Sequence, residues 1–129
     1  MKILTAKNRL PDIETQVEQL NVNDIMFIPD LKWMEKRKKP LYESLEKNGM
    51  IYPIIVTSLA CYWHQERNNW PKDETGNFRQ GMACTNGNKR LLYAKENNYD
   101  KIEAYVVKNK HERDVIIVNT YMHPTGYPK

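Results

Sequence analysis

The chain has 129 residues, enough for one hydrophobic core but hardly two, so we expect a single domain. Hydrophobic residues make up 40% and charged residues 28% of the sequence, a balance that is typical of folded soluble domains and excludes a largely disordered chain. The formal net charge of +4 permits a polyanionic partner such as DNA but does not predict one.

The N-terminal sequence predicts no targeting signal. Its first residues contain no long apolar stretch, and Pro11, Asp12 and Glu14 follow soon after. A signal peptide or a membrane span needs a longer apolar run, so we expect neither of them and predict a cytoplasmic protein.

The composition divides the chain into a folded region and two ends. Residues 1–13 are polar and contain a proline, which predicts a flexible arm, and residues 123–129 are expected to fray. The domain between them, 14–122, carries a polar excursion with two tryptophans at about 62–80. Loops of this length are usually functional or mobile, and we assign this one no role.

Strand-like patterns come first in the domain. Leu20 and Val22 alternate with polar residues, and Ile25–Pro29 is an apolar run that leads into a turn. The strongly basic segment Leu31–Lys39 follows and ends at Pro40. Because proline is favoured in the first turn of a helix, we expect a helix to begin there.

A helix and a buried strand are predicted next. Leu41 and Leu45 share one helix face, and Asn48-Gly49 supplies a stop because glycine tolerates a positive φ. Ile51–Thr57 is β-branched and mostly apolar, which predicts a central strand that is buried on both faces.

The rest of the chain predicts a strand, a glycine turn, a helix and another strand. These are Gly81–Thr85, Asn86-Gly87, Lys89–Asn97 and Lys101–Val107. Residues 111–122 contain a β-branched run, 115–118, that suits a strand. Glu112 and Asp114 near the start of the segment, and the spacing of four residues between Ile117 and Tyr121, favour a helix. The predicted fold class is α+β, with a mixed sheet of about four strands packed with three to four helices.

A series of short motifs runs through these elements in a fixed order: an arginine, a helix that reaches Asn-Gly, a Pro-Ile-x-Val strand, a Gly-x-x-Arg-x-x-Ala turn and an Ile-x-x-x-Val strand. They are Arg37, Leu41–Leu45, Asn48-Gly49, Pro53–Val56, Gly87–Ala94 and Ile102–Val106. In this order they resemble the pattern of the ParB/sulfiredoxin superfamily, whose small domain occurs in ParB proteins, sulfiredoxins and some kinases. The resemblance covers about residues 15–122 and implies a stand-alone domain with the fold of this superfamily.

The glycine turn before the second helix is the candidate phosphate-binding loop. Glycine lets the backbone approach a ligand, and the N–H groups at a helix start attract phosphate oxygens. Lys89 and Arg90 add positive charge, and the arginine fork suits bidentate contact with phosphate. The alternative is a tight turn without a ligand, in which Arg90 covers the helix surface or pairs with Glu43 or Glu46. The candidate residues are Gly87, Asn88, Lys89 and Arg90.

The resemblance adds two candidates and two departures. Arg37 aligns with a ligand-facing arginine, and Asn119 matches one residue of the Glu-Asn-x-Gln-Arg stretch that partition proteins use for CTP and magnesium. Only that residue of the stretch is present, which puts CTP switching in question. Asn88 stands where sulfiredoxins carry a reactive cysteine, so reduction of sulfinic acid is not expected.

Three functions are implied. The first is a nucleotide-phosphate-binding and DNA-interacting protein that uses Mg²⁺ with ATP or CTP and acts as a weak metal-assisted nuclease or NTPase, by analogy with stand-alone ParB-like nucleases. The second is a non-catalytic protein-binding regulator of phage or plasmid type, favoured because no glutamate stands at 88 or 118. A kinase of this fold would need a carboxylate, for which Glu43 and Glu46 are the candidates.

The basic run before Pro40 is a candidate DNA contact. Its lysines can hold DNA phosphates while Trp33 stacks on a base, or they form a solvated basic turn with Trp33 in the core. The candidate DNA-binding residues are Lys32, Lys36, Lys38 and Lys39.

The sequence shows no metal-ligand spacing. Cys61, Cys84, His64, His111 and His123 are not grouped in any zinc pattern. We therefore predict no zinc and no haem and name no metal ligands, and we expect both cysteines to be buried thiols.

Overall fold

The computed structural model of the protein describes residues 1–10, 13, 15–26, 31–58, 75 and 81–121, and of residues 31–38 and 121 it describes the backbone alone. The predicted excursion, apart from Thr75, and the predicted C-terminal tail lie outside this part of the chain. Cys61, Trp63 and the histidines at 64 and 123 lie outside it as well.

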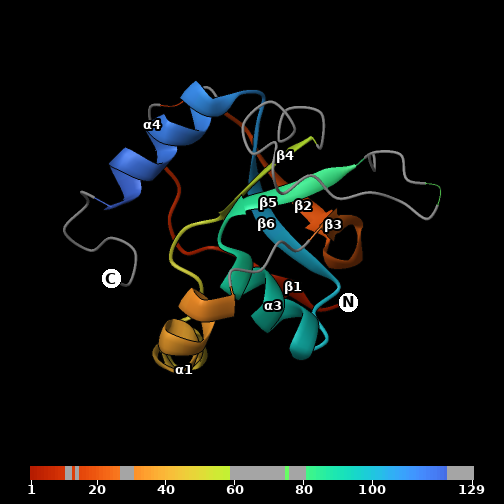
Figure 1. The fold of residues 1–129 in the computed structure, drawn as a ribbon, viewed down its shortest axis with the longest axis vertical. Coiled ribbons are helices and arrows are strands. Elements are labelled where there is room, and N and C mark those ends of the chain that lie inside the picture. Colours follow the sequence, from red (N-terminus) through yellow and green to blue (C-terminus); the bar gives the residue numbers. More distant parts are fainter. Residues whose placement is uncertain (11–12, 14, 27–30, 59–74, 76–80, 122–129) are drawn as a thin grey trace.

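A mixed sheet of six strands is the centre of the described fold (Figure 1). Its strands run in the order β1-β6-β4-β5-β3, and β2 pairs with β6. In chain order the elements are β1 (Ile3–Leu4), β2 (Val17–Asn21), the short 3-10 helix η1 (Val22–Asp24), β3 (Ile25–Met26), α1 (Leu31–Asn48), β4 (Ile54–Ser58), β5 (Met82–Asn86), α3 (Asn88–Glu96), β6 (Lys101–Val107) and α4 (Lys110–Tyr121). The predicted α+β class with a mixed sheet is confirmed. The sheet has more strands than predicted because β1 and β3 are two-residue strands, too short to show an alternating pattern.

The middle of the sheet is formed by β4, which runs parallel to β6 and antiparallel to β5. The first four residues of β4 are buried. The prediction of a central strand that is buried on both faces is therefore confirmed, with Pro53 just outside the strand, where its missing N–H is no loss to the sheet.

Each face of the sheet carries its own apolar core. The α3-side core is built around Ile54, Val56, Cys84, Leu91 and Ile102, with Leu45 of α1 packed into it. The α4-side core contains Ile55, Tyr105, Val107 and Ile116, with Leu10, Ile13 and Val17 packed against it. Neighbouring residues of β4 enter different cores because successive side chains of a strand point to opposite faces. Figure 1 shows α1 and α3 together, with α4 apart from them.

The N-terminal segment packs onto the domain, which differs from the arm expected for residues 1–13. Ile3 and Leu4 pair with β6 in parallel, and Ala6 forms a bridge to Met50. The N–H of Lys2 donates to the Asp100 carboxylate at 2.7 Å. These partners are distant in sequence, so the local composition of the segment gives no sign of them.

Helix α1 begins at Leu31, and the prediction that the helix starts after Pro40 is wrong. Proline lacks an N–H and its ring crowds the carbonyl of the preceding turn, so a helix usually avoids it at interior positions. The lysines, arginine, glutamate, leucine and methionine that precede Pro40 are good helix formers, which favours continuation through it. The predicted stop is confirmed, because Gly49 has a φ of 75° and donates its N–H to the Leu45 carbonyl at 2.9 Å.

The ambiguous C-terminal segment is helical, as the acidic residues near its start indicated. The side chain of Asn109 caps α4 by accepting the N–H of Glu112 at 2.9 Å. Glu112 in turn accepts the N–H of Lys108 at 3.3 Å. This reciprocal arrangement resembles a capping box and outweighs the β-branched run that follows it.

Candidate functional site

Gly87 forms the turn between β5 and α3 and occupies a position that no other residue fits. Its backbone is left-handed, with φ 99° and ψ 25°. A Cβ atom at this position would lie 2.6 Å from Cγ2 of Ile54 and 2.7 Å from Nη2 of Arg90. Backbone conformation and close packing against β4 therefore both require glycine here.

The first turn of α3 has no side-chain cap and no acidic residue. Its helical bonding begins at once, since Leu91 donates its N–H to the Gly87 carbonyl at 2.9 Å. The Asn88 side chain reaches back and donates Nδ2 to the Cys84 carbonyl at 3.1 Å. Gly87 and Asn88 are both half-buried, so the turn reaches the surface with the positive end of the helix dipole behind it.

Arg90 lies inside the protein, with 2% of its surface exposed. Its Nη1 donates to the Tyr52 carbonyl, and its Nη2 lies 3.4 Å from Oδ1 of Asn86. The guanidinium thus connects α3 to the segment before β4 and to the end of β5. Lys89 is also buried, at 4% exposure. The alternative in which Arg90 covers the helix surface is wrong, because the side chain is enclosed.

Cys84 is a buried thiol, as predicted, with 1% of its surface exposed. Its Sγ donates to the Asn86 carbonyl at 3.3 Å. Burial raises the pKa of the Cys84 thiol to about 12, although the charges of Arg90 and Lys95 act in the opposite direction. A thiol with so high a pKa stays protonated at neutral pH and is a poor nucleophile.

The structure separates Asn119 from the glycine turn. Asn119 is exposed on α4 and donates its Nδ2 to the Val115 carbonyl of the same helix at 2.7 Å. Helix α4 belongs to the α4-side core, whereas the glycine turn lies at the start of α3, on the other face. These two predicted parts of one site are therefore not brought together.

The basic run lies in the N-terminal half of α1. Lys32, Lys36, Arg37 and Lys38 are helical residues whose side chains lie outside the described part, and Lys39 is exposed. Helix α1 is fixed to α3 by Tyr42, whose ring meets that of Tyr93 at 5.2 Å and whose hydroxyl donates to Glu96 at 3.2 Å. The run is thus carried by a helix that packs on the same face of the sheet as the glycine turn.

The described residues form neither a candidate metal site nor a candidate membrane-spanning helix. Among them, no three histidine, cysteine, aspartate or glutamate side chains come together in a group that could hold a metal ion. None of the helices they form is both long enough and apolar enough to cross a membrane.

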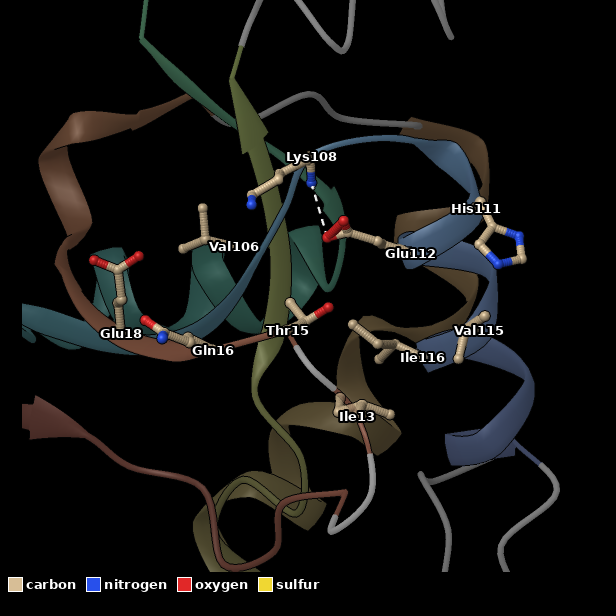
Figure 2. Close-up of a pocket in the computed structure, with 10 residues that line it drawn as sticks. All are labelled: Ile13, Thr15, Gln16, Glu18, Val106, Lys108, His111, Glu112, Val115 and Ile116. Atoms are coloured by element: carbon tan, nitrogen blue, oxygen red, sulfur yellow. Dashed lines mark hydrogen bonds between the residues drawn. The ribbon is translucent and has the colours of Figure 1, made fainter.

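A second concave site, which the sequence did not suggest, lies beside β2. It is a hollow of about 540 Å³ between the start of β2, the end of β6 and α4. Figure 2 shows its lining residues: Ile13, Thr15, Gln16, Glu18, Val106, Lys108, His111, Glu112, Val115 and Ile116. Only long-range packing creates it, so no sequence signal short of a correct sheet order could have indicated it.

No protein-family model matches the chain, and a search of curated proteins gives no match either.

Proposed function

We propose that this chain is a ParB/sulfiredoxin-type domain that binds the phosphates of a nucleotide at the Gly87–Arg90 turn. We propose that it also interacts with DNA. The observation that carries the proposal is the left-handed Gly87, which turns β5 directly into α3 and leaves the start of that helix without a side-chain cap. A glycine turn that opens a helix is a common anion site, because the backbone can approach phosphate closely and the helix dipole favours negative charge.

The order of the elements supports the same assignment. The helix α1, the central strand β4, the strand β5, the glycine turn, α3 and β6 follow one another as the family pattern requires. The basic run of α1 would then give DNA phosphates a second point of contact on the α3 side of the sheet.

Arg90 has an indirect role in this proposal. Its guanidinium is enclosed and donates to the Tyr52 carbonyl, so it holds the turn in position. Its charge also makes the electrostatic potential at the turn more positive. Direct contact with phosphate then falls to the backbone of Gly87–Lys89.

The proposed role is binding without catalysis at this turn. The first turn of α3 contains no acidic residue, so it offers Mg²⁺ no carboxylate ligand and offers a reacting water no base. The residues of the turn therefore do not fit a resident magnesium ion, and the nuclease and NTPase activities implied by the resemblance are not part of the proposal.

Asn88 is the residue with which to test it, because an Arg90 variant would disturb the fold. Asn88→Asp places a negative charge at the phosphate position, and Asn88→Ala is the matched control. Both variants lose the bond from Nδ2 to the Cys84 carbonyl, so they differ chiefly in charge. The aspartate also stabilises a helix start, so loss of binding would not reflect loss of the helix.

Calorimetric titration with ATP, CTP, GTP and a short DNA duplex, with and without magnesium, gives the readout. We expect Asn88→Asp to weaken nucleotide affinity about tenfold or more, which is about 1.4 kcal/mol, and Asn88→Ala to stay within about threefold of wild type. Absence of nucleotide binding by the wild-type protein, or equal binding by the two variants, would contradict the proposal.

A further inference from the structure

Strand β2 is an edge of the sheet whose outer side is open along the described residues. It pairs with β6 from Val17↔Tyr105 to Asn21↔Lys101, and no other described strand pairs with it. An edge strand presents a row of backbone donors and acceptors that a further strand can use.

The hydrogen bonds flanking β2 show which of its backbone groups point outward. Val106 donates its N–H to the Gln16 carbonyl at 3.3 Å, and Val22 donates to the Asp100 carbonyl at 3.0 Å. In an antiparallel pair the hydrogen-bonded positions alternate, so residues 16, 18, 20 and 22 face β6. The N–H and carbonyl groups of Val17, Gln19 and Asn21 therefore face away from it.

The hollow of about 540 Å³ follows the same edge at its N-terminal end. Figure 2 shows Val106 and Glu18 on one side of Thr15, and Val115, Ile116 and Ile13 on the other. The hollow thus extends to both sides of the edge, with Glu18 in one wall and Val115 and Ile116 in the other. The α4 wall also carries His111 and Glu112. Successive side chains of an added strand would enter these two walls in turn.

We propose that β2 and this hollow bind an extended peptide segment of another protein by strand addition. The added strand bonds to the backbone of Val17, Gln19 and Asn21. Its side chains alternate, with apolar ones against Val115 and Ile116 and a basic one beside Glu18. Main-chain bonds give affinity and the alternating walls give selectivity, as in other strand-addition sites.

A second copy of this chain fits the hollow less well than such a peptide. Antiparallel pairing of two β2 strands would carry the C-terminal half of the partner strand, with Gln19 and Asn21, toward the apolar wall. Beyond that point the chain turns into η1 and is no longer extended. The second copy would therefore place polar residues against an apolar surface and leave part of the hollow unfilled.

The test uses an acetylated, amidated peptide in which valine alternates with lysine, labelled with fluorescein. The protein carries a net charge of +4, so net charge alone does not attract this cationic probe. Its fully N-methylated analogue keeps every side chain but cannot donate from the backbone. Fluorescence polarisation should show binding of the first peptide and about a tenfold or greater loss for the second.

The matched protein variants are Gln19→Pro and Gln19→Thr. The N–H of Gln19 points outward, so proline at this exposed position removes a donor for the added strand and leaves the bonds to β6 in place. We expect about a tenfold or greater loss of peptide affinity for proline and little change for threonine. Wild-type affinity in Gln19→Pro would overturn the proposal.

The hollow is tested with Val115→Lys against Val118→Lys. Val115 lines the hollow, whereas Val118 is 54% exposed on the same helix and does not line it. A charge at Val115 should weaken the peptide about tenfold, and the same charge at Val118 should not. Equal affinities of the two variants, or no binding of the alternating peptide to the wild-type protein, would also overturn the proposal. The Asn88 variants should bind the peptide with wild-type affinity. Failure of the peptide-binding proposal can therefore be distinguished from failure of the nucleotide-binding proposal.

Discussion

The two faces of the sheet are held together in different ways. On the α3 side, helices pack on an apolar core and even the cationic side chains of Lys89 and Arg90 are buried. On the α4 side, the N–H groups of Ala6 and Leu10 bond to side chains of β6 in addition to the apolar packing of Leu10 and Ile13, and the outer edge of β2 pairs with no described strand. We infer that the glycine turn is fixed by packing. On the opposite face, single side-chain hydrogen bonds hold the N-terminal segment, and each can be removed by one substitution.

Glu103 shows how the N-terminal segment is held. Its carboxylate is 3% exposed, accepts the N–H of Ala6 at 2.7 Å and pairs with Arg9 at the same distance. Two residues along β6, the Tyr105 hydroxyl accepts the N–H of Leu10 at 2.8 Å. Alternate residues of β6 therefore hold successive parts of one segment.

The largest effect is expected from Gly87→Ala, with Gly49→Ala as its matched control. Both glycines have a positive φ, but the nearest contact of an added Cβ is 2.6 Å at Gly87 and 3.4 Å at Gly49. Backbone strain alone should cost about 1 to 2 kcal/mol at either site, and the collision with Ile54 should raise the cost at Gly87 to about 3 kcal/mol. Urea denaturation measures both, and equal losses would contradict the view that packing fixes the turn.

An intermediate effect is expected on the opposite face. Glu103→Gln removes the charge that accepts from Ala6 and Arg9 and should lower the free energy of unfolding by about 2 kcal/mol. Arg9→Ala should cost no more than about 1 kcal/mol, because the Arg9 side chain is 57% exposed and its pair is screened by solvent. A glutamine at 103 can still accept the N–H of Ala6, so the loss in Glu103→Gln measures the charge of the acceptor. A larger loss for Arg9→Ala than for Glu103→Gln in the same denaturation assay would contradict this ranking.

A smaller, pH-dependent effect belongs to Cys84. The unfolded thiol loses its proton near its ordinary pKa of 9.0, whereas the folded thiol keeps it up to about 12. Between these values the unfolded state binds fewer protons, so stability falls as pH rises. The free energy of unfolding at pH 10 should be about 1.4 kcal/mol lower than at pH 7 in the wild type, relative to Cys84→Ala. Identical pH profiles would contradict the buried, uncharged thiol.

Much of the fold could be predicted because its signals are local. The apolar run that forms β4, the alternation in β6 and the stop at Gly49 each depend on neighbouring residues, and each prediction is confirmed. The start of α1 at Leu31 does not follow from the sequence, because an interior proline usually marks a helix boundary. The strands β1 and β3 do not follow from it either, because two residues are too few to show an alternating pattern.

The candidate site was predictable in part. The strand, glycine and helix at Gly87 follow from the sequence, but the burial of Arg90 does not, because its acceptor at Tyr52 comes from another part of the sheet. The resemblance groups Asn119 with the turn, but α4 lies on the other face of the sheet and separates the two. The edge of β2 and its hollow required the strand order itself.

The central claim is that nucleotide phosphates bind at the Gly87 turn, and an amide NMR titration of the wild-type protein with ATP and CTP tests it most directly. We expect the largest shifts at the amides of Gly87, Asn88 and Lys89, with those of Val17, Gln19 and Asn21 unchanged. Shifts confined to the β2 edge, or no shifts at millimolar nucleotide, would contradict the claim and leave the domain with the peptide-binding edge alone.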